Sequence, residues 1–414
     1  MNRPLSQLFQ QIVRRARELV ESRDGDPIAA IMQDCQELIS SRGEASGLAL
    51  ASGIFVALGR LDAQQLAEFV AQLDRELGVD HADLARAIEH YQSDPDAAAQ
   101  VHHASEPRRQ ELFRRLNSAP NGTLELIRLR ERMLDLDIDR AIRRRVDQDF
   151  VHLFTSWFNK GFLTLTQVDW TTPADLLEKL IQYESVHEIQ GWDDLRRRLA
   201  GDRRCFAYMH PAVPNEPLIF VEVALVKGIA SAITPLLNEP ESDPVDADTA
   251  VFYSINNCQR GLAQVSFGNF LIKQVVHQLR EQLPQLKTFV TLSPIPGLRR
   301  WAEQHQVAMD TASDPQNARL QCLDYLLSMK NDRPLDPVAR FHLGNGARLE
   351  QIHVDADPSD SGQARSYGMM VNYLYEADEI ISNHEALLLR GEVALSGPLK
   401  SLEKQLKSAR NAHG

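Results

Sequence analysis

One stretch whose residues could take part in catalysis places a serine directly before the first of two nearby prolines. Ser293 follows the apolar run 288–292, which reads as a buried strand, and it precedes Pro294 and Pro296. Proline fixes φ and has no amide donor, so we expect the chain to leave a sheet at Ser293. This geometry would present the Ser293 hydroxyl at the end of a strand.

A second stretch places a histidine next to a glycine-rich turn. His342 lies in the apolar run 338–343, which predicts another strand, and Gly-Asn-Gly at 344–346 predicts a turn at its rim. A serine and a histidine at neighbouring strand ends indicate a candidate site. The ordinary alternatives are a turn hydroxyl at Ser293 and a satisfied core residue at His342, because motifs this short discriminate weakly.

The elements that must position these residues fall into two parts. Before residue 160, apolar side chains recur at steps of three and four residues, which predicts amphipathic helices. The clearest stripe consists of Leu66, Phe69, Val70, Leu73 and Leu77. Residues 1–160 are therefore predicted to form an all-helical bundle domain that serves oligomerisation.

After residue 160, the sequence pattern changes and predicts strands mixed with helices. A helix is predicted over 270–283, and strands are predicted at 205–209, 218–226, 250–255, 289–292, 338–343 and 367–375. Alternation of this kind is typical of a mixed α/β or α+β domain. The prediction for the whole chain is an α+β fold, with a helical bundle at 1–160 followed by a mixed catalytic domain at 161–414.

Composition narrows the class of protein. The 414 residues are 43% hydrophobic and carry a formal charge of -12, which argues against a nucleic-acid-binding protein. The apolar runs 47–59 and 217–226 are too short to span a bilayer, and the first 22 residues lack the apolar core of a signal peptide. We therefore expect no membrane partner and a cytoplasmic location.

Metal and disulfide chemistry are not indicated. The four cysteines, at positions 35, 205, 258 and 322, are far apart and form no CxxC pair. The pair His102-His103 has no further histidine or carboxylate at ligand spacing. The sequence predicts free buried thiols, no metal site and no cofactor.

Small residues connect the predicted strand at 250–255 to the predicted helix at 270–283. Backbone amides in such a segment can approach an anion, and a helix N-terminus favours a pyrophosphate. The candidate binding residues are Ala263, Gln264, Val265, Ser266, Phe267, Gly268 and Asn269. The alternative is a plain strand-to-helix connection.

Three segments resemble the malonyl-coenzyme A decarboxylase family in order and spacing. They are VFYSINNCQRGLAQVSFGNFLIKQVVHQLREQLPQLKTFVTLSPIPGLRR at 251–300, PVARFHLGNGARLEQIH at 337–353 and GMMVNYLY at 368–375. The resemblance extends upstream through SWFNKGFLTL, YESVHEIQGW and RRCFAYMHP. It implies malonyl-CoA as substrate, a homotetramer and a catalytic domain like that of the GCN5-related acetyltransferases.

The resemblance also implies residue roles. Residues 263–269 match the coenzyme A loop, although Ala263 replaces a leading Arg or Gln and Ser266 replaces the first Gly. Ser293 and His342 match the two catalytic positions. We assign His342 as proton donor from its reference pKa near 6.5, and Ser293 to holding the malonyl carboxylate or to acting with His342.

Tyr375 is a plausible supporting hydroxyl, or else a strand tyrosine with a solvated tip. The thioester carbonyl itself accepts the electron pair left by decarboxylation, so the reaction needs coenzyme A held fixed, donors for the enolate oxygen and a proton source.

Two other functions fit the same fold, because fold does not determine function. One is an acyltransferase that moves an acyl group from coenzyme A to an amine. The other is a non-catalytic acyl-CoA sensor that uses the helical part for interaction. Production of carbon dioxide without an acceptor separates the first from a decarboxylase, and binding without turnover identifies the second.

Overall fold

The computed structural model describes residues 25–40, 44–265 and 271–413. Contacts divide the described chain into two compact units. The first contains the helices up to residue 163 and also two later segments, 210–214 and 259–265. The second contains the remaining residues from 164 onward, including the whole sheet.

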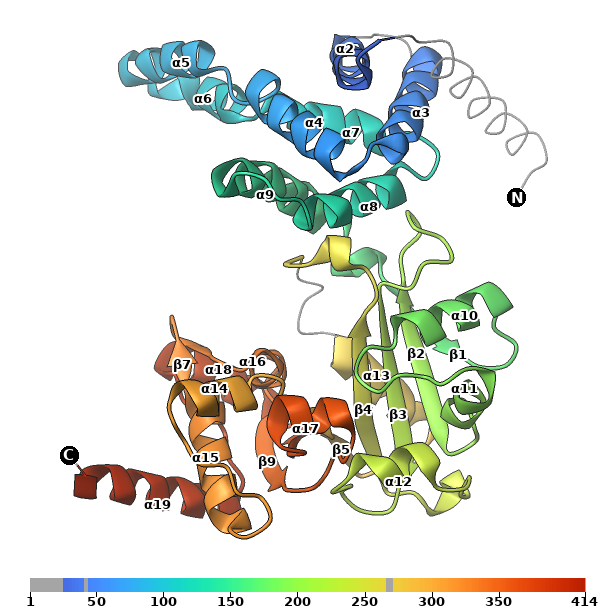
Figure 1. The fold of residues 1–414 in the computed structure, drawn as a ribbon, viewed down its shortest axis with the longest axis vertical. Helices are drawn as coiled ribbons and strands as arrows, with labels where there is room; N and C mark the ends of the chain where they lie inside the picture. The colour runs from blue at the N-terminus through green and yellow to red at the C-terminus, as the bar shows by residue number, and fades with distance from the viewer. Residues whose placement is uncertain (1–24, 41–43, 266–270, 414) are drawn as a thin grey trace. The chain divides into compact units, whose positions relative to one another are not determined.

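The first unit is helical (Figure 1). Its α-helices are α2 (Pro27–Ser40), α3 (Glu44–Arg60), α4 (Ala63–Glu76), α5 (His81–Ser93), α6 (Ala98–Ser105), α7 (Arg108–Asn117), α8 (Gly122–Leu134) and α9 (Arg140–Trp157). Short 3₁₀ turns are η1 (Pro95–Ala97), η2 (Lys160–Phe162) and η4 (Arg260–Leu262).

Helix α4 shows why these segments fold as predicted. Asp62 and Gln65 form a capping box, in which each side chain accepts a hydrogen bond from the other residue's backbone amide. The predicted stripe from Leu66 to Leu73 is buried along one side of the helix. Aromatic packing joins neighbouring helices, because Phe113 of α7 stacks on Phe150 of α9 with ring centroids 4.3 Å apart.

The second unit is built on a mixed sheet. Its strands are β1 (Thr164–Val168), β2 (Arg203–Met209), β3 (Ile219–Val226), β4 (Thr249–Asn257), β5 (Thr288–Thr291), β6 (Ser293–Pro294), β9 (Arg348–His353) and β10 (Met370–Leu374). The strand order is β1-β2-β3-β4-β5-β10-β6, and β9 also pairs with β10. Strands β4 and β5 pair in parallel, and the other described pairs are antiparallel.

The helices of the second unit follow and separate these strands along the chain. They are α10 (Ala174–Tyr183), α11 (Trp192–Arg198), α12 (Ile233–Asn238), α13 (Leu271–Gln282), α14 (Leu298–Gln304), α15 (Pro315–Leu327), α16 (Pro337–Gly344), α17 (Asp360–Ser366), α18 (Ile380–Arg390) and α19 (Gly397–His413). A turn η3 (Pro244–Asp246) and a small hairpin of β7 (Met329–Lys330) and β8 (Arg333–Pro334) complete the unit.

Alternating strand residues assign the helices to faces. Ala207 of β2 packs with Leu177 of α10 and Leu195 of α11. The next residue, Tyr208, points to the other face and donates a hydrogen bond to the carbonyl oxygen of Leu271 in α13, at 2.5 Å. Figure 1 shows α10 and α11 on the opposite side of the strands from α13.

The predicted fold class, a helical part followed by a mixed α/β part, is confirmed. The strand predicted at 338–343 is wrong, because this run lies in helix α16. The strand predicted at 367–375 begins only at Met370, because Tyr367 ends α17 in the left-handed region at φ 55°. Within the part of the chain that the model describes, no helix is long and apolar enough to cross a membrane.

Candidate active site

Ser293 lies inside the sheet rather than beyond its end. The strand β5 stops at Thr291, but β6 continues the pairing with β10, where Ser293 lies opposite Val371 and Pro294 opposite Met370. The prediction that the chain leaves the sheet at Ser293 is therefore wrong. Proline is tolerated because β6 ends the strand order, so the side of Pro294 away from β10 needs no amide donor.

His342 lies near the C-terminal end of α16. Asp336 caps this helix, since its Oδ1 accepts from the backbone amides of Val338 and Ala339 at 2.9 Å each, and Pro337 occupies the first helical position. An apolar run of six residues fits a strand or a helix equally well by periodicity. The Asp-Pro pair before it was the signal for a helix.

The structure brings the three predicted catalytic side chains together. The Nε2 atom of His342 lies 3.2 Å from the Oγ atom of Ser293, and its Nδ1 atom lies 2.8 Å from the hydroxyl oxygen of Tyr375. All three residues are buried, with 5% or less of their surface exposed. Both ring nitrogens of His342 are therefore committed to defined partners.

Two residues that the sequence analysis missed complete this hydrogen-bonded set. The Ser293 hydroxyl donates to Thr291 Oγ1 at 2.8 Å, and the same Thr291 oxygen accepts from the backbone amide of Tyr373 at 3.1 Å. The ring of Tyr373 stacks on the imidazole of His342, with centroids 4.6 Å apart. Two-residue spacing was the available signal, because Thr291 precedes Ser293 by two positions and Tyr373 precedes Tyr375 by two.

Burial sets the charge state of the histidine. Burial lowers the pKa of His342 to about 3, and it raises the pKa of Tyr375 well above its usual value. His342 is therefore a neutral imidazole at neutral pH, with one ring nitrogen that donates a hydrogen bond and one that accepts. The reference pKa of 6.5, from which the proton-donor role was argued, does not describe the histidine in this environment.

A buried carboxylate, that of Asp336, links the helix that carries His342 to the segment that follows Ser293. The Oδ2 atom of Asp336, which caps the helix of His342, accepts from the Tyr325 hydroxyl at 3.1 Å. Gly297, four residues after Ser293, packs so closely on this pair that a Cβ there would lie 2.0 Å from the Tyr325 hydroxyl oxygen. The carboxylate of Asp336 is fully buried, and this burial raises its pKa.

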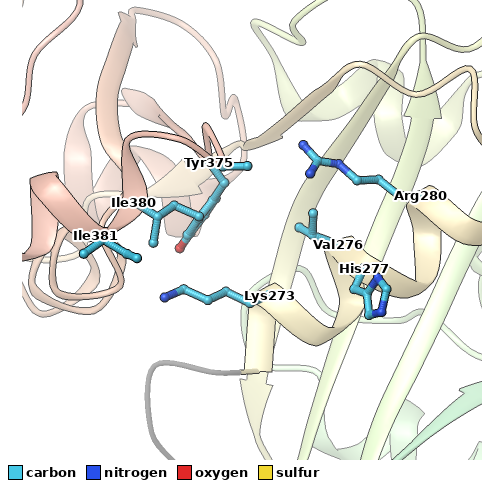
Figure 2. A pocket seen from close by; sticks show the side chains of 8 residues that line it. Lys273, Val276, His277, Arg280, Tyr375, Ile380 and Ile381 are labelled. Atoms are coloured by element: carbon cyan, nitrogen blue, oxygen red, sulfur yellow. The ribbon is translucent and has the colours of Figure 1, made fainter.

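A pocket of about 290 Å³ opens beside Tyr375. Its walls come from α13 and from α18 with the segment before it. Figure 2 shows the Tyr375 hydroxyl pointing toward the space between Ile380 and Lys273, with Arg280 further along α13. The pocket combines an apolar wall with cationic side chains, which suits an anionic molecule with an apolar portion.

The predicted coenzyme A segment is described only in its first part. Ala263, Gln264 and Val265 follow the turn η4, and Gln264 adopts a left-handed backbone at φ 69°. The predicted binding residues Ser266, Phe267, Gly268 and Asn269 lie outside the described residues.

Candidate metal ligands do not cluster in the described ranges, where no group of three or more His, Cys, Asp or Glu side chains could hold a metal ion. The four cysteines are free and buried, as the sequence predicted.

Comparison with known proteins gives a consistent assignment. The family model of the malonyl-CoA decarboxylase N-terminal domain matches residues 77–158, and that of the C-terminal domain matches 161–325 and 318–413. A mitochondrial malonyl-CoA decarboxylase from Anser anser anser is 31% identical over 404 residues, which cover 82% of this chain and 80% of the relative. The enzyme of the same name from Rattus norvegicus is 30% identical over 414 residues, covering 84% of each chain.

Two solved structures are similar over almost their whole length. The crystal structure of malonyl-CoA decarboxylase from Rhodopseudomonas palustris superposes with a TM-score of 0.85 at 46% identity, covering 90% of this chain and 99% of that one. The corresponding structure from Agrobacterium vitis gives a TM-score of 0.84 at 49% identity with the same coverage.

Proposed function

The chain belongs to the malonyl-CoA decarboxylase family, and from this membership and the geometry of its buried site we propose that it converts malonyl-CoA to acetyl-CoA and carbon dioxide. The observation that carries this proposal is the buried set in which His342 joins Ser293 on one side and Tyr375 on the other.

The reaction in this proposal proceeds through a thioester enolate. The bond between the methylene carbon and the carboxylate breaks, carbon dioxide leaves, and the electron pair moves onto the thioester oxygen. A proton then forms the new C–H bond as the carbonyl is restored. Because the thioester is its own electron sink, the chemistry requires no metal or organic cofactor; coenzyme A enters as part of the substrate.

The protein groups divide this work between them. The raised pKa of Tyr375 keeps its hydroxyl protonated, so it can donate to Nδ1 of His342 and leave the ring proton on Nε2. This Nε2–H faces Ser293 and is the proton source, either directly or through the Ser293 hydroxyl, and a proton from solvent water then restores Nε2–H. To bind the malonyl carboxylate, the Ser293 hydroxyl turns its hydrogen from Thr291 Oγ1 to the substrate, and residues 263–269 bind the coenzyme A portion.

Burial of this set favours the chemistry. A carboxylate is strongly solvated in water, and it loses this stabilisation in a site where Ser293 and His342 are almost fully shielded. A hydrogen-bond donor acts more strongly on the developing enolate oxygen in such surroundings. The neutral state of His342 agrees with this role, since the imidazole can donate without first becoming charged.

The test is an assay of the purified protein with malonyl-CoA alone. We expect equal amounts of acetyl-CoA and carbon dioxide. Transfer of an acyl group only when an amine is present would instead identify an acyltransferase. Binding of malonyl-CoA without turnover would identify a sensor.

We propose a homotetramer in the cytoplasm as the working state. The ground for a tetramer is the resemblance to a family of homotetramers, because the apolar stripe of α4 is already buried within the chain. The relatives from Anser anser anser and Rattus norvegicus are named as mitochondrial, so location is a point on which this chain would differ from them. Light scattering after gel filtration measures the assembly, and cell fractionation measures the location.

A further inference from the structure

The segment 259–265 follows β4 in the chain, yet it packs on helix α8 of the helical unit. Its turn η4 lies so close to α8 that a Cβ at Gly261 would be 2.1 Å from the carbonyl oxygen of Ile127. A Cβ atom at this distance from a carbonyl oxygen would clash, so no residue with a side chain fits at position 261. The backbone of the segment is therefore held against α8 at a position that requires glycine.

A buried arginine of α8 forms hydrogen bonds with the backbone of this segment. Arg130 has no exposed surface, and its Nη1 donates to the carbonyl oxygens of Gly261 at 2.8 Å and of Ala263 at 2.7 Å. Its Nε donates to Asp147 Oδ1 at 2.8 Å, which fixes the plane of the guanidinium. Arg130 therefore restrains the backbone immediately before the left-handed residue Gln264.

The remaining donor of this guanidinium is not used. Arg130 Nη2 is buried without a hydrogen-bond partner in the described structure. A buried polar group of this kind is uncommon in folded proteins and is often associated with function. Here it leaves a spare donor and a positive charge beside the start of the segment expected to bind a pyrophosphate.

We propose that Arg130 is a positioning residue for coenzyme A binding, which it serves by fixing the backbone of residues 261–265. This inference rests on the proposed binding of coenzyme A by the segment that begins at Ala263.

The experiment titrates free coenzyme A into the full-length protein by calorimetry. Arg130→Met removes both carbonyl contacts, and we expect coenzyme A to bind on the order of 10-fold more weakly, because hydrogen bonds from a charged donor are lost. In a turnover assay, the same variant should raise KM with little change in kcat. Arg130→Lys keeps the charge but loses the planar guanidinium. Its Kd for coenzyme A should lie between those of the wild type and Arg130→Met.

Arg132 supplies a matched control on the same helix. Its guanidinium donates to the carbonyl oxygens of Leu58 at 2.9 Å and Leu61 at 2.7 Å, within the helical unit and away from residues 259–265. Arg132→Met should lower the melting temperature about as much as Arg130→Met while leaving the Kd for coenzyme A unchanged. Equal weakening of binding in both variants would overturn the proposal, since it would indicate general destabilisation.

A second variant keeps the proposal testable if Arg130→Met does not fold. Gly261→Ala leaves Arg130 intact but forces the segment away from Ile127, so it should also weaken coenzyme A binding. Wild-type affinity in folded Gly261→Ala and Arg130→Lys would refute the positioning role. Binding of free coenzyme A is measured without turnover, so failure of this inference is distinct from failure of the decarboxylase assignment.

Discussion

Ser293 Oγ and His342 Nε2 lie 3.2 Å apart although 49 positions separate the two residues in the chain. One belongs to a two-residue strand and the other to an eight-residue helix. Neither element is long enough to hold its side chain by itself. The relationship therefore depends on the contacts that tie both elements to the sheet and to each other.

Replacement of His342 tests the proton source. His342→Asn keeps a polar side chain but removes the transferable ring proton, so kcat should fall by about 100- to 10,000-fold. The measurement is acetyl-CoA formation, with circular dichroism to confirm folding. His305→Asn, at an exposed position at the end of α14, is the control and should retain normal activity. A folded His342→Asn enzyme with most of its activity would remove His342 from the mechanism.

Replacement of Ser293 separates hydrogen bonding from covalent catalysis. Ser293→Ala should lower kcat strongly and leave the Kd for coenzyme A nearly unchanged, because the hydroxyl contacts the malonyl end. Ser366→Ala removes a comparably buried hydroxyl and should leave kcat intact. Mass spectrometry after rapid quenching should find no acyl group on Ser293. An adduct that forms and decays at the catalytic rate would establish a covalent intermediate instead.

The lowered pKa of His342 predicts a pH-dependent stability. Burial lowers this pKa from 6.5 to about 3, so between these values the unfolded chain binds more protons than the folded one. The free energy of unfolding should therefore rise with pH through this window and fall on acidification, by up to about 1.4 kcal/mol per pH unit from this residue.

Denaturant unfolding of wild type and His342→Asn at several pH values isolates this contribution. Other buried histidines act in the same direction, since burial also lowers the pKa of His187 to about 4, but they are common to both proteins. The wild-type curve should descend more steeply toward acid. Parallel curves would show that His342 titrates normally.

Asp336 should control the placement of His342. Tyr325→Phe leaves Asp336 Oδ2 without its hydroxyl partner, and Asp336→Ala removes the cap of α16; each should lower kcat about 10-fold with little effect on KM, because a small misplacement slows the chemical step. Asp314→Ala removes an equivalent cap on α15 and should lower stability by only about 0.5–2 kcal/mol without a specific loss of kcat. A loss of kcat in all three variants would indicate a general stability effect.

Exhaustive chelation should leave turnover unchanged, because the thioester accepts the electron pair without a Lewis acid. The measurement compares initial rates before and after dialysis against a chelator, with metal content determined in parallel. Stoichiometric metal whose removal abolishes turnover, and whose return restores it, would contradict the expectation.

Local sequence patterns predicted much of this fold, and together with the family resemblance they pointed to three of the five residues in the hydrogen-bonded set. The stripe from Leu66 to Leu73 and the strands around 205–209 and 218–226 were predicted correctly, because periodicity reports which face an element buries. The error at 338–343 arose because a short apolar run fits the periodicity of a strand and of a helix equally well. The N-cap at Asp336 indicates that the run forms a helix.

Other features depend on distant contacts that no local pattern contains. Stacking of Tyr373 on His342 and the closure of Tyr325 on Gly297 join segments far apart in sequence. The low pKa of His342 has the same origin, because it results from burial by several elements at once. Residue type identified the candidates, but only the folded chain determines their charge state.

The four buried cysteines have a practical consequence for a protein that handles a thiol. Burial raises the pKa of each of them, so almost none of the reactive thiolate is present at neutral pH. Oxidised coenzyme A and alkylating reagents should therefore leave the native protein unmodified. A single cysteine introduced on the surface would then be selectively reactive, which allows a fluorescent reporter to be attached without first removing the natural thiols.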